Sequence, residues 1–142
     1  MRDMFNRINI KPVINPPAAA ITDNTAQVGA IIDKQGYDSL TYIIQTGNLA
    51  DADATFTTLL EESNDPAMAG ATTVAAKDLL GTLALASFNF AGDNKVFKLG
   101  YIGNKRYTRL TVTPAANTGA APIAATVVLA SGSLQPTPNP PA

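Results

Sequence analysis

The chain has 142 residues, and its ten Lys and Arg against eleven Asp and Glu leave a net charge of −1. A charge so close to zero provides no general field that would draw the protein to nucleic acid or to a membrane surface. The sequence has no Cys, His or Trp, which excludes thiol nucleophiles, disulfides, zinc sites of the usual ligand sets and imidazole-based catalysis.

Residues 1–17 combine alternating apolar side chains with Pro12, Pro16 and Pro17, which exclude a helix and disfavour a central strand. We expect an extended arm or an edge strand, whose apolar side chains contact either this domain or a neighbouring molecule. The side chains expected to make that contact are Phe5, Ile8, Ile10 and Val13. No apolar run in the chain is long enough to cross a bilayer, so we expect a soluble protein made in the cytoplasm.

Residues 26–33 and 38–46 are predicted strands, separated by the turn Lys34-Gln35-Gly36. The short connection predicts that they are antiparallel neighbours. Alternation along the second strand places one set of apolar side chains on the core face. That set is Leu40, Tyr42 and Ile44.

Residues 47–53 form a turn-rich loop that leads into a strand at 54–62. Asp51 and Asp53 have the spacing of a calcium loop, but the glycine and glutamate that such a loop needs are missing. We therefore expect a solvated loop without metal. The side chains predicted to face the core from the following strand are Phe56, Thr58 and Leu60.

Residues 63–81 are the least regular part of the chain, and they either contact a partner or cover the domain as a loop. A two-turn helix at 74–80, with Thr73 as N-cap and Gly81 after its end, is one expectation here. Residues 83–90 are a predicted strand. The side chains predicted to point inward from it are Ala86, Phe88 and Phe90.

Residues 95–113 give the strongest pattern, two strands joined by the dipeptide Gly103-Asn104, which suits a tight primed hairpin turn. The register of such a hairpin sets Lys98 opposite Arg109 and lays Tyr107 across Gly100. The predicted core face is Phe97, Leu99, Tyr101, Leu110 and Val112, and the predicted outer face is Lys98, Tyr107, Arg109 and Thr111. A partner contact is expected at Lys98, Tyr107 and Arg109.

After a turn segment at 114–122, the last predicted strand spans 123–130, and the Pro-rich residues 133–142 are expected to be an exposed tail. About eight short strands with little helix predict an all-β protein, an antiparallel jelly roll or β-sandwich. The predicted organisation is an arm at 1–17, the β-domain at 18–132 and the tail at 133–142.

No cluster of residues indicates catalysis, a cofactor or a metal. Glu61 and Glu62 are adjacent and point to opposite faces of a strand, so they cannot form the facing carboxylate pair of a glycosidase. Basic residues and tyrosines near 98–109 resemble a surface for single-stranded nucleic acid, but the slightly negative net charge favours a protein contact or a solvated patch. We therefore expect a protein that is not an enzyme and that binds neither nucleic acid nor membrane.

Four stretches within residues 36–132 carry a family resemblance: GYDSLT, LADAD, GNKRY and TPAANTGAAP. Here the chain resembles small proteins encoded among the head genes of tailed phages and prophages. The resemblance implies a jelly-roll cement or decoration protein on the outer capsid surface, located in the virion, with the major capsid protein as its partner. It supplies no catalytic residues.

Other roles remain open at this stage. A homodimer or higher oligomer is expected, because closed symmetric pairing is the commonest assembly. A head–tail connector or tail component is a second function. A carbohydrate-binding module on a spike is a third, and it would need exposed aromatic side chains for stacking on sugars. The candidates for that stacking are Phe5, Tyr37 and Tyr107.

Overall fold

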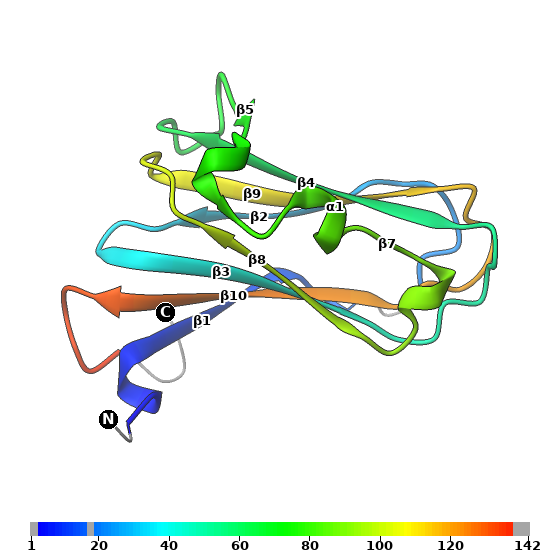
Figure 1. The fold of residues 1–142 in the computed structure, drawn as a ribbon, viewed down its shortest axis with the longest axis horizontal. Helices are drawn as coiled ribbons and strands as arrows, with labels where there is room; N and C mark the ends of the chain where they lie inside the picture. The colour runs from blue at the N-terminus through cyan, green and yellow to red at the C-terminus, as the bar shows by residue number, and fades with distance from the viewer. Residues whose placement is uncertain (1–2, 17–18, 138–142) are drawn as a thin grey trace.

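The computed structural model describes residues 3–16 and 19–137, which form two five-stranded antiparallel sheets packed as a β-sandwich, with one short helix (Figure 1). The expected all-β class is therefore confirmed. Sheet 1 contains, in spatial order, β1 (Ile8–Ile14), β10 (Ile123–Gly132), β3 (Tyr37–Thr46), β8 (Val96–Tyr101) and β6 (Leu79–Leu80). Sheet 2 contains β2 (Gln27–Asp33), β9 (Tyr107–Ala115), β4 (Thr55–Ser63) and β5 (Thr72–Thr73), with β7 (Phe88–Asn89) also paired to β4.

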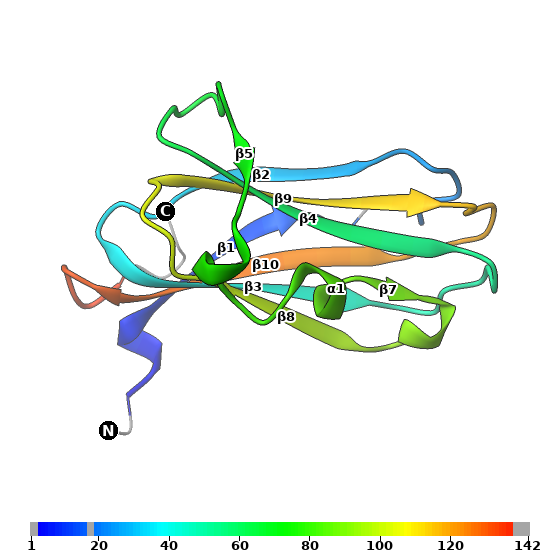
Figure 2. The ribbon, with the colours of Figure 1, turned by 45° about the horizontal axis from the view of Figure 1, so that its top comes forward.

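The helical pieces are all short, and all but the first of them lie between strands. They are α1 (Leu83–Ala86) and the 3₁₀ turns η1 (Phe5–Arg7), η2 (Ala76–Asp78) and η3 (Phe90–Gly92). Helix α1 contacts β4 of one sheet and β8 of the other, where the two layers are open at their edges (Figures 1 and 2). It therefore covers strand edges that would otherwise be free to pair with another chain.

The core lies between the sheets and is built by the alternation of side chains along each strand. The inward residues predicted for β3 and β4 are buried, as are those predicted for β8 and β9 except Phe97, which is partly buried against the same core. Phe88 stacks between Phe56 and Phe97, with ring centroids 5.0 and 5.1 Å apart. Alternation thus predicted correctly which face of each long strand is buried.

The predicted hairpin at 95–113 is wrong, because β8 belongs to sheet 1 and β9 to sheet 2. A primed turn needs positive φ, and neither Gly103 nor Asn104 has it. Gly103 is needed for another reason, since a Cβ there would lie 2.6 Å from the Tyr101 ring. The connection crosses from one layer to the other, so the two apolar faces meet across the core.

The predicted pairing of 26–33 with 38–46 is also wrong. The strands exist, but β2 pairs with β9 and β3 pairs with β10 and β8. The turn between them, with Gly36 at a φ of +84°, is a second crossing between the layers. The two crossings lie together, because the Lys34 amide donates to the Arg106 carbonyl at 3.0 Å and the Lys34 ammonium donates to the Gly103 carbonyl at 2.7 Å.

Two local predictions fail between the long strands. The helix expected at 74–80 is replaced by η2 and β6, because the Val74 amide donates to the Leu60 carbonyl and ties this segment to β4. The strand expected at 83–90 is replaced by α1 and β7. The Thr82 hydroxyl accepts from the Leu85 amide and caps the helical turn. Phe90, predicted to point inward, is 43% exposed in η3.

The N-terminal segment is an edge strand, the second of the two expectations for it. Strand β1 pairs along its length with β10, so from Ile8 onward this segment is part of the sandwich and not a separate arm. The tail expected to be exposed is described only up to Thr137; residues 138–142, like 1–2 and 17–18, lie outside the described residues. Thr137 is buried, and its hydroxyl donates to the Ile8 carbonyl at 2.6 Å.

Candidate functional site

The outward-facing side of sheet 1 is the most distinctive surface of the described residues. Its four long strands lie side by side on one side of the molecule (Figures 1 and 2). The alternate residues of each strand are buried in the core, which leaves the others pointing outward. We call this surface the sheet 1 face, and it consists of Ile8, Ile10, Pro12, Ser39, Thr41, Ile43, Gln45, Leu80, Val96, Lys98, Gly100, Ala124, Thr126, Val128 and Ala130.

Strand register arranges these side chains in rows across the sheet. The longest row crosses all five strands and has an isoleucine at one end and a leucine at the other: Ile10, Val128, Thr41, Gly100 and Leu80. The row beside it consists of Pro12, Thr126, Ile43 and Lys98. Leu80 lies over Gly100, where a Cβ would meet the Leu80 side chain at 2.9 Å, so the glycine lets this leucine pack flat.

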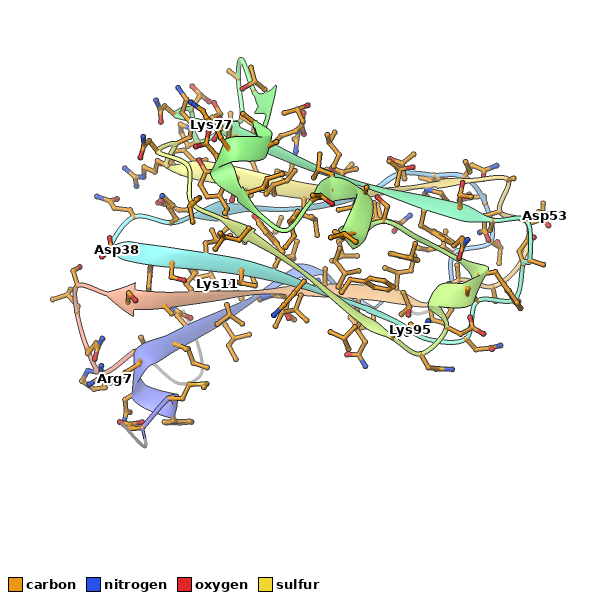
Figure 3. The ribbon with its side chains drawn as sticks, in the orientation of Figure 1. Arg7, Lys11, Asp38, Asp53, Lys77 and Lys95 are labelled. Carbon is orange, nitrogen blue, oxygen red and sulfur yellow. The ribbon has the colours of Figure 1, made fainter. Side chains whose placement is uncertain are left out.

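The sheet 1 face carries one charged residue, Lys98, and no carboxylate. Within the described residues, Lys98 forms no hydrogen bond or ion pair. Of the charged residues labelled in Figure 3, Arg7 and Asp38 lie at one end of the sandwich, and Asp53 and Lys95 lie toward the other. Lys11 lies within β1, opposite the buried Val127, so it is not on the sheet 1 face. The centre of this face is apolar and hydroxyl-bearing, and the single cation of the face, Lys98, ends its row on β8.

The outward side of sheet 2 differs, because its charges are paired. The Arg109 guanidinium donates to the Glu61 carboxylate at 2.9 Å across β9 and β4. The Arg106 guanidinium donates two hydrogen bonds to the Asp33 carboxylate, the shorter at 2.7 Å, and lowers the pKa of that carboxyl. These charged side chains of sheet 2 therefore pair with one another. On the sheet 1 face, Lys98 has no such partner within the described residues.

An open groove of about 510 Å³ lies at the N-terminal corner of the sheet 1 face. Its apolar lining includes Ile8 and Ala130, which also belong to that face, and Met4 from the segment before η1. Met4 and Phe5 are 70% and 65% exposed, although methionine and phenylalanine are usually buried. The charged residues Asp3 and Arg7 also line the groove, so it adds both apolar and charged surface at this corner.

The sequence-predicted contact residues divide among three places. Ile8, Ile10 and Lys98 lie on the sheet 1 face, and Phe5 is exposed in η1. Val13 is buried in the core and is not available to a partner, which corrects the prediction for it.

Tyr107 and Arg109 lie on the opposite side of the sandwich from Lys98, because β9 is in sheet 2. The predicted patch of Lys98, Tyr107 and Arg109 is therefore wrong. The Tyr107 ring is covered by Arg106, whose guanidinium carbon is 4.9 Å from the ring centroid. Lys98 and Arg109, which were predicted to lie opposite each other, are not neighbours.

Comparisons with known proteins do not assign the chain to a family. No protein-family model matches the chain, and no curated protein matches it. Within the described residues, no helix is long and apolar enough to cross a membrane, and no group of three or more potential ligand residues could hold a metal ion. Any functional assignment therefore depends on the surface just described.

The carboxylates that are best fixed in place have structural partners. The Asp51 carboxylate accepts hydrogen bonds from the amide and hydroxyl of Thr118, each at 2.8 Å, and these contacts lower the pKa of Asp51. The Glu62 carboxylate accepts from the Tyr101 hydroxyl at 2.6 Å. The first contact joins two loops, and the second joins β4 of sheet 2 to β8 of sheet 1. Neither places two acids across a cleft, as glycoside hydrolysis would require.

Sequence reasoning missed the central residues of the sheet 1 face, including Ile43, Thr126 and Val128. A signal for them was present, because residues 39–50 and 110–142 contain no charged residue. A strand with one solvated face normally carries polar or charged residues there. Residues 39–46 and 123–132 carry uncharged polar groups at these positions, among them Thr41, Gln45 and Thr126, beside apolar ones.

Proposed function

We propose that this chain is a non-catalytic structural protein of a tailed-phage virion, which binds the outer surface of the assembled capsid as a cement or decoration protein. The observation that carries the proposal is the sheet 1 face, a broad surface with one charge and several exposed apolar side chains. Surfaces of this kind mark protein contacts. The resemblance of residues 36–132 to head-gene proteins supports the same role.

We further propose that the sandwich is a jelly roll. The support is the nested order of its antiparallel pairs: β1 with β10, β2 with β9, β3 with β8, and β4 with β7. A chain paired in this way, from both ends toward its middle, is folded as one long hairpin wound into two layers, which is the jelly-roll arrangement.

A cement protein stabilises a shell by mass action. It binds the assembled capsid and not its separated subunits, so bound copies lower the free energy of the assembled state. At a concentration about 100-fold above Kd, each occupied site contributes about 2.7 kcal/mol. Our proposal places the chain in the virion after synthesis in the host cytoplasm, with the major capsid protein as its partner.

The test is the copy number of the chain in purified particles, measured by quantitative mass spectrometry against the major capsid protein. The proposal predicts a ratio near one chain to one capsid subunit. A dozen copies or fewer would instead indicate a connector, a tail component or a spike module. A particle without the chain would contradict a virion role.

A further inference from the structure

Strand β1 is an edge of sheet 1, and every second residue in it directs its backbone groups away from β10. The Thr137 hydroxyl donates to the Ile8 carbonyl at 2.6 Å, so Ile8 is one of these residues, and the alternation adds Ile10 and Pro12. Pro12 has no amide hydrogen, and an edge strand accommodates proline where no bond to a neighbouring strand is needed. Within the described residues, the Ile10 amide and carbonyl therefore have no partner.

The hydrogen bonds further into sheet 1 require the same alternation. The Gly47 amide, one residue after β3, donates to the Pro122 carbonyl on the β10 side at 2.9 Å. Odd-numbered residues of β3 therefore bond to β10, and the register extends this alternation across β10, where Val127 bonds to Lys11 of β1. The backbone groups of Ile10, the residue before Lys11, must then point outward.

A free edge of this kind can pair with an identical edge, and the contacts of β1 leave one two-fold register open. An axis at Lys11 would set two ammonium groups opposite each other. An axis at Pro12 would leave carbonyls without a donor. An axis nearer the start of the strand would need the Ile8 carbonyl, which already accepts from Thr137. An axis at Ile10 remains.

We propose that two copies of the chain pair antiparallel through the free edge of β1, with the two-fold axis at Ile10. Ile10 of each copy donates to the Ile10 carbonyl of the other, and each Ile8 amide donates to the Pro12 carbonyl of the other. The Ile8 carbonyl lies opposite Pro12, which has no hydrogen to donate, and Thr137 satisfies this carbonyl within its own chain. The Ile10 side chain, 43% exposed in one copy, packs beside its equivalent.

The side chains on the inner side of this edge also complement a second copy. The register sets Asn9 opposite Lys11 of the other copy, in the class of pair whose side chains lie closest. The Asn9 Oδ1 atom is buried and, within the described residues, accepts no hydrogen bond, while the amide nitrogen donates to the Tyr37 hydroxyl at 2.8 Å. In the same part of the chain, the Lys11 ammonium forms no hydrogen bond or ion pair. Pairing thus brings an acceptor without a donor beside a donor without an acceptor.

This pairing joins two copies of sheet 1 edge to edge and keeps both sheet 1 faces on one side. The inference therefore goes beyond the proposed function and does not depend on it. The two Lys11 side chains are diagonal neighbours, and the Asp33 carboxylate, which interacts electrostatically with Lys11, offsets part of their repulsion. The paired segment, residues 8–12, is far smaller than a standard interface, so the dimer is weak and its population rises with concentration.

The first test uses the purified full-length chain, which has no cysteine of its own. Ile10→Cys places a thiol at the two-fold axis, where the two Cα atoms are about 5.5 Å apart, a distance that suits a disulfide. With diamide as oxidant, it should form covalent dimer at least about tenfold faster than Val96→Cys, because pairing raises the local thiol concentration. Val96 is 63% exposed and lies on β8, away from β1, so it is the control. Equal rates would overturn the proposal.

The second test measures the dimer Kd by sedimentation velocity for wild type, Lys11→Met and Lys77→Met. Lys11→Met keeps the side chain's length and loses the ammonium, so it should dimerise at least about tenfold more weakly. Lys77→Met, at an exposed lysine in η2, should match wild type. A wild-type chain that stays monomeric up to about 1 mM, or Lys11→Met that dimerises as tightly as wild type, would overturn the proposal. Neither test contains capsid shells, so either failure leaves the proposed function untouched.

Discussion

Tyr42 and Thr108 join the two sheets through a hydrogen bond in the middle of the core, with 2.7 Å between their hydroxyl oxygens. Both side chains are fully buried, and burial raises the pKa of the Tyr42 phenol. Tyr42→Phe should therefore destabilise the protein by about 1 to 3 kcal/mol, because the Thr108 hydroxyl loses its partner without gaining water. Urea unfolding measures the difference.

The matched control is the double variant Tyr42→Phe with Thr108→Val. Removing both hydroxyls leaves no unpaired group, so the double variant should be close to wild type in stability or at least more stable than Tyr42→Phe alone. Additive losses from the two single substitutions would mean that the hydrogen bond between the sheets contributes nothing of its own.

Asp51 makes one loop contact sensitive to pH. Hydrogen bonds from the Thr118 amide, then from its hydroxyl and from the Asp53 amide, lower the pKa of Asp51 below its ordinary value. A lowered pKa means that the carboxylate stabilises the fold above its unfolded pKa of about 3.9, and that this contribution is lost as pH falls through the folded pKa.

Asp51→Asn should therefore be less stable than wild type at neutral pH, and the gap should close below about pH 4. Urea midpoints at three values of pH measure the gap. A gap that stays constant down to pH 3 would show that the ionised carboxylate is not what holds the loop.

Strand β1 closes one side of the sandwich by packing closely on β2. A Cβ at Gly29 would lie 2.6 Å from both the Leu110 carbonyl and the Val13 side chain. Gly29 also falls where the register of β2 with β9 shifts, between Val28 and Ile31. The absence of a side chain at this position is what allows the two edge strands to cover each other.

Gly29→Ala should destabilise the protein by about 2 kcal/mol, because the Leu110 carbonyl belongs to the backbone and cannot move aside. Ala30→Val, at the exposed neighbouring position, is the control and should change stability by less than about 0.5 kcal/mol. Thermal unfolding of both variants measures this. Equal losses of stability in the two variants would show that the close approach of β1 to Gly29 does not explain the loss.

Sequence predicted the elements better than their pairing. The inward residues of β3 and β4 follow from the two-residue period, which depends only on the strand's own side chains. The partners do not follow, because Lys34-Gln35-Gly36 and Gly103-Asn104 suit a hairpin and a crossing between layers equally well. An apolar strand face is buried in either arrangement. Only the backbone geometry of the turn determines whether a hairpin or a crossing between layers forms.

The candidate site was predictable in part. Ile8, Ile10 and Lys98 were expected to face a partner, and they do point outward from one surface. Tyr107 and Arg109 were placed with Lys98 because of the hairpin register, so the error in pairing became an error in the site. The exposed position of Leu80 required knowledge of its pairing with Gly100, which no local pattern contains.

The whole molecule is a sandwich with two unlike outer sides. Sheet 2 pairs its arginines with its own carboxylates, whereas sheet 1 presents hydroxyl and apolar groups and one lysine. A rigid body of this kind is suited to covering a shell from one side, with sheet 2 exposed to solvent. The proposed function therefore predicts an orientation, with sheet 1 toward the capsid and sheet 2 away from it.

The most direct measurement uses the absence of cysteine from the chain. Thr126→Cys and Thr113→Cys each place one thiol at an exposed position, on the outer sides of sheet 1 and sheet 2 respectively. The rate of maleimide labelling is measured with and without shells. The account predicts that shells slow labelling strongly for Thr126→Cys and leave Thr113→Cys unchanged, and equal labelling of Thr126→Cys in both conditions would contradict it.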